Sequence, residues 1–217
     1  MITLYHCASA RSFRVLWALE ELGLPYRLEL LPFPPRVHQK TYLGINPLGT
    51  VPLLIDGGTR MTESAAICQY LATRYGPTPL AVGVDEPGYG TFLNFLAFGE
   101  ASLTFPQALV LRYGRLEAGR GLGAVAEDYA RWFAGRLRGV DAIVATEPYV
   151  AAGRFTAADI SVGYALMLAE ILGLDTHFSD AVAAYWRRLA AREGYQRALT
   201  AQGTSAEVDP LAARPIT

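Results

Sequence analysis

Residues 44–56, GINPLGTVPLLID, and residues 61–67, MTESAAI, carry the features that decide the fold of this chain. The dipeptides Asn46-Pro47 and Leu48-Gly49 favour turns. The apolar run that follows has the length of a buried strand, but Pro52 near its start cannot donate a hydrogen bond to a neighbouring strand. We therefore expect this strand to leave backbone groups unpaired at its beginning, where a ligand can reach them.

The second stretch begins with a hairpin signal and ends in a helix. Residues 56–58, Asp-Gly-Gly, favour a tight turn into a short strand, and Glu63 and Ser64 then open an apolar-periodic segment. An acid and a hydroxyl at a helix N-terminus can receive an amino group and a carboxylate. The plain alternatives are that Pro52 only starts a strand and that Glu63 and Ser64 only cap a helix.

The preceding residues predict a parallel strand pair. Residues 2–6 are typical of a strand, residues 9–21 show the spacing of an amphipathic helix, and Gly23 ends it. Residues 26–31 alternate as a second strand. A strand, helix and strand of this length imply a parallel pair with a right-handed crossover.

The rest of the first region completes an α/β domain. Residues 32–42 predict an irregular loop with a short helix, residues 51–55 and 60–62 two more strands, and residues 63–75 a closing helix. The resulting order, β-α-β-α-β-β-α, is typical of a thioredoxin fold.

Beyond residue 76 the pattern becomes entirely helical. Prolines and glycines mark residues 77–88 as a linker. We predict a first domain over residues 1–76, a helical bundle domain over residues 89–203 and a tail over residues 204–217. The helices of the helical bundle domain are expected at residues 89–113, 125–146, 157–172 and 180–192. Thr156 and Asp159 form a capping box before the third of these, a folding device.

Composition excludes several classes of function. A formal net charge of −1 over 217 residues argues against nucleic acid as a partner. No apolar run is long enough to span a bilayer and the first residues lack a signal sequence, so we expect a cytoplasmic protein without membrane contact. The two cysteines and three dispersed histidines predict neither a disulfide scaffold nor a metal site.

Taken together, Pro52 and the Glu63-Ser64 pair resemble the glutathione-binding site of the cytosolic glutathione S-transferase superfamily. The resemblance covers nearly the whole chain, and it implies a thioredoxin-like domain followed by an all-α domain. It also implies that the peptide bond before Pro52 is cis. The Val51 backbone, next to Thr50, would pair with the cysteinyl part of glutathione, and Glu63 and Ser64 would hold its γ-glutamyl end.

The chemical task that the resemblance implies is to ionise the thiol of glutathione, which otherwise titrates near pH 8.5. A helix N-terminus and hydrogen-bond donors lower that pKa. Ser9 is our first candidate for stabilising the thiolate, followed by Ser12, with Arg11 supplying positive charge. Tyr5 is the candidate if the chain resembles the tyrosine classes. Cys7 would shift the chemistry toward deglutathionylation and thiol reduction if it faced the sulfur.

Matching by position offers further site residues. Gln39 and Lys40, or His38, would bind the glycyl carboxylate of glutathione. Apolar and aromatic side chains would line a pocket for the second substrate, although ordinary helix packing explains each of them equally well. These pocket candidates are Phe13, Phe105, Leu109, Arg112 and Tyr113.

The resemblance implies an enzyme that uses the glutathione thiolate on a small hydrophobic electrophile, as a homodimer, with glutathione as co-substrate and no metal. Two other functions stay open. One is a non-enzymatic protein of the same fold acting in protein association or regulation. The other is a glutathione-dependent thiol reductase, which depends on Cys7.

Overall fold

The computed structural model describes residues 1–203, so the predicted tail over residues 204–217 lies outside the described residues. The described chain divides into two compact units. Among the described residues, the first unit comprises Met1–Thr78 and residues 192–203, and the second comprises Pro79–Ala191.

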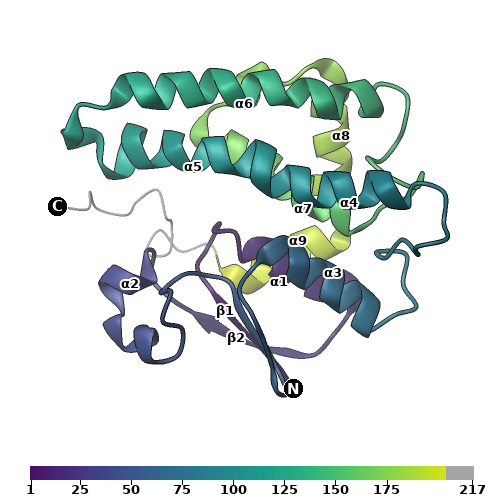
Figure 1. Ribbon diagram of the computed structural model, residues 1–217, viewed down its shortest axis with the longest axis horizontal. Helices are drawn as coiled ribbons and strands as arrows, with labels where there is room; N and C mark the ends of the chain where they lie inside the picture. The colour runs from purple at the N-terminus through teal and green to yellow at the C-terminus, as the bar shows by residue number, and fades with distance from the viewer. Residues whose placement is uncertain (204–217) are drawn as a thin grey trace. The chain divides into compact units, whose positions relative to one another are not determined.

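The first unit has the predicted thioredoxin-like order (Figure 1). Its elements are β1 (Ile2–His6), α1 (Phe13–Leu22), β2 (Tyr26–Leu30), α2 (Pro35–His38), the 3₁₀ helix η1 (Lys40–Gly44), β3 (Leu53–Asp56), β4 (Thr59–Met61), α3 (Ser64–Arg74) and α9 (Glu193–Gln202). The helix α1 ends at Gly23, whose φ of 62° is left-handed as expected for a glycine at this position.

The sheet of this unit has the strand order β2-β1-β3-β4. The strands β1 and β2 are parallel, which confirms the predicted parallel pair, and β1 and β3 are antiparallel with Tyr5 opposite Leu53. Because β1 runs toward the beginning of β3, the residues that follow β1 lie beside those that precede β3.

Two predicted element starts are wrong. The helix α1 begins at Phe13 and not at residue 9, because residues 7–12 form tight turns in which the Ala10 amide donates to the Cys7 carbonyl (3.1 Å). Ser9 therefore does not cap the helix; its φ of 54° is left-handed. The strand β3 begins at Leu53, after Pro52, whose nitrogen has no hydrogen to donate.

Apolar side chains cover both faces of the sheet. Alternate residues of β1, Leu4 among them, are fully buried, as are Phe13–Leu19 along α1. Tyr5, Phe33, Val51 and Ile55 pack against a small cluster of buried apolar residues in this unit. Its buried members are Cys7, Ala10, Leu31, Tyr42 and Leu53.

The second unit is helical. Its elements are α4 (Tyr89–Phe98), the π-helical segment η2 (Gly99–Thr104), α5 (Phe105–Leu111), the π-helical segment η3 (Arg112–Leu116), the 3₁₀ helices η4 (Ala118–Arg120) and η5 (Asp175–His177), α6 (Gly123–Val144), α7 (Ala157–Leu172) and α8 (Asp180–Ala190). The helices α5 and α6 lie side by side (Figure 1). Among residues 1–203, no helix combines the length and apolar composition needed to cross a membrane.

The buried helix α7 begins with the predicted capping box. The Ala158 amide donates to the Thr156 hydroxyl (3.3 Å), and the Asp159 carboxylate accepts from the Thr156 amide (2.8 Å). Asp159 also accepts from the Val150 amide (3.0 Å) and the Tyr185 hydroxyl (2.8 Å). This carboxylate thus ties the preceding loop and α8 to the start of α7, which is a structural role.

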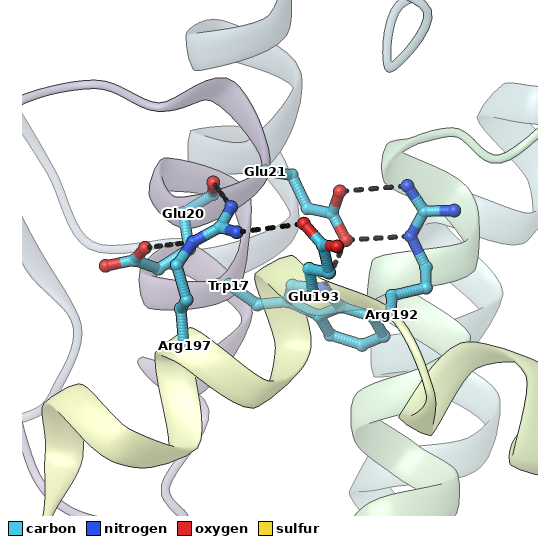
Figure 2. A network of polar contacts seen from close by, with 6 residues as sticks. All are labelled: Trp17, Glu20, Glu21, Arg192, Glu193 and Arg197. Carbon is cyan, nitrogen blue, oxygen red and sulfur yellow. Dashed lines mark hydrogen bonds and ion pairs between the residues drawn. The ribbon is translucent and has the colours of Figure 1, made fainter.

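The helix α9 belongs to the first unit, whereas the sequence placed it in the helical domain. It packs beside α1 through an ionic network (Figure 2). Arg192 donates two hydrogen bonds to Glu21 (2.8 and 2.9 Å), and the Trp17 indole nitrogen donates to the same carboxylate (3.0 Å). Arg197 pairs with Glu20 (3.0 Å). These long-range partners attach α9 to the first unit.

The close approach of α9 to α1 requires Gly194. A Cβ atom at this position would lie 2.5 Å from Cδ of Glu21, which Arg192 and Trp17 hold in place. We expect Gly194→Ala to lower the free energy of unfolding by about 1–3 kcal/mol through overpacking. Gly135→Ala in α6, whose Cβ would meet only the Arg138 side chain at 3.8 Å, should be neutral or stabilising. Equal urea midpoints for the two variants would contradict this account.

Candidate functional site

Three segments of the first unit meet at one end of its sheet. The turn after β1 (residues 7–12) lies beside Val51 and Pro52, because β1 and β3 are antiparallel neighbours and because Cys7 and Ala10 share a cluster with Val51. The start of α3 joins them, since Arg14 of α1 donates a hydrogen bond to Ser64 (3.1 Å). We call this convergence the three-segment site.

Two side chains hold the residue that precedes the Val51–Pro52 segment. The Tyr42 hydroxyl and the Asn46 amide nitrogen both donate to the Thr50 carbonyl (2.9 Å each). The Val51–Pro52 peptide bond is cis, as the resemblance implies. In the register of the described strands, pairing with β1 begins at Leu53, so no strand residue lies opposite Val51. The backbone of Val51 is therefore placed to pair with an extended ligand.

The start of α3 has an exposed acid and a buried hydroxyl. Glu63 occupies the N-cap position without a side-chain capping bond, and Ser64 is 4% exposed. Because the Ser64 oxygen accepts from the Arg14 guanidinium, the hydroxyl hydrogen stays available for donation. The N-terminal amides of α3 and the nearby cation both favour a bound anion.

Arg14 was not among the site residues predicted from the sequence. Its side chain is fully buried between the apolar residues of α1 and lies against Ser64. A single cation on the inward face of an apolar helix, within Phe13–Leu19, was the available signal. Buried charges require partners, so such a residue indicates a polar site.

A buried polar relay runs beneath the turn after β1, and its hydrogen positions follow from its geometry. The Ser9 amide donates to Oε1 of Gln202 (3.0 Å), which fixes that amide oxygen as an acceptor. Nε2 of His6 lies 3.2 Å from the same oxygen and must therefore carry the hydrogen. Burial lowers the pKa of His6 to about 4, so the ring is neutral at pH 7.

The relay determines what Ser12 can do. Since Nε2 of His6 carries the hydrogen, Nδ1 accepts, and the Ser12 hydroxyl 2.7 Å away donates to it. The Ser12 oxygen in turn accepts from the Cys7 amide (3.3 Å). The hydroxyl hydrogen is thus committed inside the protein, and the side chain is fully buried. This argues against Ser12 as a donor to a bound thiolate.

The other candidates for thiol activation differ in placement. Ser9 is half-buried at the outer part of the turn, and Arg11 is half-buried next to it. The Tyr5 ring packs against Tyr42, with ring centres 5.5 Å apart. Cys7 is fully buried, its thiol donates to the Pro32 carbonyl (3.7 Å), and burial raises its pKa to about 12, which makes it a poor nucleophile at pH 7.

The predicted glycyl-carboxylate residues lie at the junction of α2 and η1. Gln39, Lys40 and the alternative His38 are all exposed. Within residues 1–203 they make no polar contact with the three-segment site, and their role stays a prediction.

The structure divides the predicted second-substrate residues between the two units. Phe13 is fully buried in the first unit, in edge contact with Tyr195 (5.5 Å between ring centres), which is typical of a core residue. The other four lie in the second unit. There, Phe105 is 51% exposed beside Tyr129, Leu109 is half-buried, and Arg112 pairs with Glu117 (2.8 Å) while lying over the Tyr113 ring.

Comparison with known proteins gives consistent relatives. A family model described as "Glutathione S-transferase, N-terminal domain" matches residues 8–74. The chain is 30% identical over 187 residues to glutathione S-transferase PM239X14 of Arabidopsis thaliana, covering 80% of this chain and 84% of the plant protein. It is 35% identical over 103 residues to glutathione S-transferase 3 of Schizosaccharomyces pombe, covering 48% of this chain and 43% of that relative.

A solved structure of similar fold extends this likeness over nearly the whole chain. A glutathione transferase from Methylococcus capsulatus superposes with a TM-score of 0.82 at 26% identity. The superposition covers 94% of this chain and 99% of that structure. The likeness therefore includes the helical second unit as well as the sheet.

The buried neutral His6 makes stability depend on pH. Its pKa falls from 6.5 in the unfolded chain to about 4 in the fold, so the unfolded chain binds the proton more readily. The stabilisation is complete above pH 6.5 and is lost as the pH falls toward 4, by about 3 kcal/mol. Burial raises the pKa of Asp159 to about 6, which gives a contribution of the opposite sign in this range, so urea unfolding at several pH values measures the sum of the two.

A matched pair of variants isolates the contribution of His6. His6→Gln should remove the loss in the free energy of unfolding that protonation of His6 causes between pH 6.5 and 4, and so change the slope of the whole chain by that amount. His177→Gln, at an exposed position, should leave it unchanged. The account is wrong if both variants keep the slope of the unaltered chain.

Proposed function

The chain belongs to the cytosolic glutathione S-transferase superfamily, and from this premise we propose that it is an enzyme that ionises bound glutathione and transfers its thiolate to a small hydrophobic electrophile. The observation that carries the proposal is the three-segment site. A backbone edge at Val51, an uncapped start of α3 and a hydroxyl-bearing turn meet there within one unit.

In this proposal the tripeptide binds along the backbone of Val51, with Thr50 and Pro52 beside it. Its γ-glutamyl amino group pairs with Glu63, and its γ-glutamyl carboxylate accepts from Ser64. The buried Arg14, 3.1 Å from the Ser64 oxygen, favours this carboxylate through its positive charge. Gln39 and Lys40 lie on the exposed junction available to the glycyl carboxylate.

Ser9 is the proposed donor to the thiolate. Ser12 donates to His6, whereas Ser9 lies half-buried at the outer part of the turn before α1. A hydroxyl donor, the start of α1 and the cation of Arg11 each favour the anion over the thiol and so lower its pKa. Tyr5 is the second candidate for this role.

The remaining parts of the proposal concern partners and alternatives. We expect a homodimer in the cytoplasm, a role in detoxification and a second-substrate pocket that uses Phe105, Leu109, Arg112 and Tyr113.

The alternative is a non-enzymatic member of the superfamily, which would keep the fold without turnover. Retention on immobilised glutathione, followed by turnover of a chloronitroaromatic acceptor, distinguishes the two. The burial of Cys7 disfavours a thiol reductase.

The binding half of the proposal is tested at Ser64. Ser64→Ala should weaken glutathione binding by roughly 1–3 kcal/mol, because the bound carboxylate loses its donor. Isothermal titration calorimetry measures the change. Ser179→Ala, which removes the N-cap of α8, should lower stability but leave the affinity intact. Unchanged affinity in Ser64→Ala would remove this residue from the site.

The activating half is tested at Ser9. Ser9→Ala should raise the pKa of the bound thiol by about 1–2 units, the equivalent of one charge-assisted hydrogen bond, while the affinity for glutathione stays nearly constant. Ultraviolet titration of the thiolate in the binary complex measures this pKa. A pKa equal to that of the unaltered enzyme would reject Ser9 and favour Tyr5.

A further inference from the structure

We propose that Gln202, the last residue of α9, is a positioning residue that holds the Ser9 turn in its thiolate-binding conformation. This inference rests on the proposed function, because it concerns the geometry of the proposed donor. Gln202 lies 193 residues from Ser9 in the sequence, yet its side-chain oxygen accepts a hydrogen bond from the Ser9 amide (3.0 Å).

The conformation of Ser9 needs such a support. Its φ of 54° lies in the left-handed region, which a serine adopts only at a cost in free energy unless the surroundings stabilise it. Its amide hydrogen points to the side-chain oxygen of Gln202. The side-chain oxygen of Gln202 thus supplies this amide with an acceptor from a distant part of the chain.

Gln202 also connects Ser9 to the interior of the unit. Its oxygen accepts from Nε2 of His6, whose Nδ1 accepts from Ser12, and the Ser12 oxygen accepts from the Cys7 amide. Gln202 is 6% exposed, so this acceptor is buried. The hydrogen bonds that start from it reach residues at both ends of the turn. A change in this acceptor should alter the orientation of Ser9, and with it the contact to the thiolate, without changing the proposed contacts to the two ends of glutathione.

The position of Gln202 is set at the other end of α9. Arg192 and Arg197 bind Glu21 and Glu20 at the end of α1, as Figure 2 shows. The ion pairs hold the beginning of α9 against the last turn of α1, while Gln202 ends α9 against the turn before α1. The helix α9 therefore extends along α1 from one end to the other. Its contacts with α1 hold Gln202 in place beside the Ser9 amide.

The experiment compares two variants of Gln202 in the full chain. Gln202→Leu removes the acceptor with similar side-chain volume, and Gln202→Glu retains an acceptor oxygen. We expect Gln202→Leu to lower kcat about tenfold or more, to raise the pKa of the bound thiol by about one unit, and to leave the KM for glutathione within about twofold. Gln202→Glu should recover most of the lost kcat.

The matched control is Gln107→Leu. Gln107 is a fully buried glutamine of the second unit whose amide donates to the carbonyls of Leu103 and Ala165 (3.0 Å each). This variant should lower thermal stability but leave the pKa of the bound thiol unchanged. A merely structural role for Gln202 would give the same pattern as Gln107→Leu.

The outcomes separate this inference from the proposed function. An unchanged thiol pKa and kcat in Gln202→Leu, or equal losses in Gln202→Leu and Gln202→Glu, overturns the positioning role while leaving the function standing. If the unaltered protein does not ionise glutathione, or if Ser9→Ala has no effect, the function itself fails, and with it this inference. A raised pKa in Gln202→Leu alone, with recovery by glutamate, supports it.

Discussion

The pairing of β1 with strands on both sides is the constraint on which the candidate site depends. Because β3 runs antiparallel to β1, the end of one strand and the beginning of the other lie at the same edge of the sheet. The turn that follows β1 and the cis Val51–Pro52 segment that precedes β3 are brought together by this register alone. Moving the register by one residue would turn every side chain of β3 to the opposite face.

The hydroxyl groups around this edge differ in whether their hydrogen is already donated within the protein. Ser12 uses its hydrogen for His6 and its oxygen for the Cys7 amide, which exhausts its capacity for a strong donation to a ligand. Ser64 instead accepts from Arg14 and keeps its hydrogen. Burial does not distinguish the two serines, since both side chains are almost inaccessible to solvent. The bonding partners decide which serine can act on a bound molecule.

Local sequence signals predicted most of the first unit and the start of α7 in the second. Glycine at residue 23, the proline before β3 and the capping box at Thr156 each act within a few residues, and the structure contains all of them. The start of α1 was predicted too early, because serines and small residues fit a first helical turn as well as the tight turns that form here.

The missed features depend on partners that are distant in the sequence. Gln202 and Arg192 contact His6 and Glu21, more than 170 residues earlier in the chain, and no local spacing encodes such contacts. The helix α9 was assigned to the wrong unit for the same reason, since its helical pattern resembles that of the helices in the second unit. Arg14 had a signal, a cation within an apolar run, but its partner Ser64 could be found only in the fold.

The most direct measurement is a crystal structure of the protein with glutathione bound. The account predicts the cysteinyl backbone paired with Val51, the γ-glutamyl carboxylate at Ser64, and the sulfur within hydrogen-bond distance of the Ser9 hydroxyl. A peptide bound away from Val51, or a sulfur directed at Tyr5 or Cys7 and away from Ser9, would contradict it.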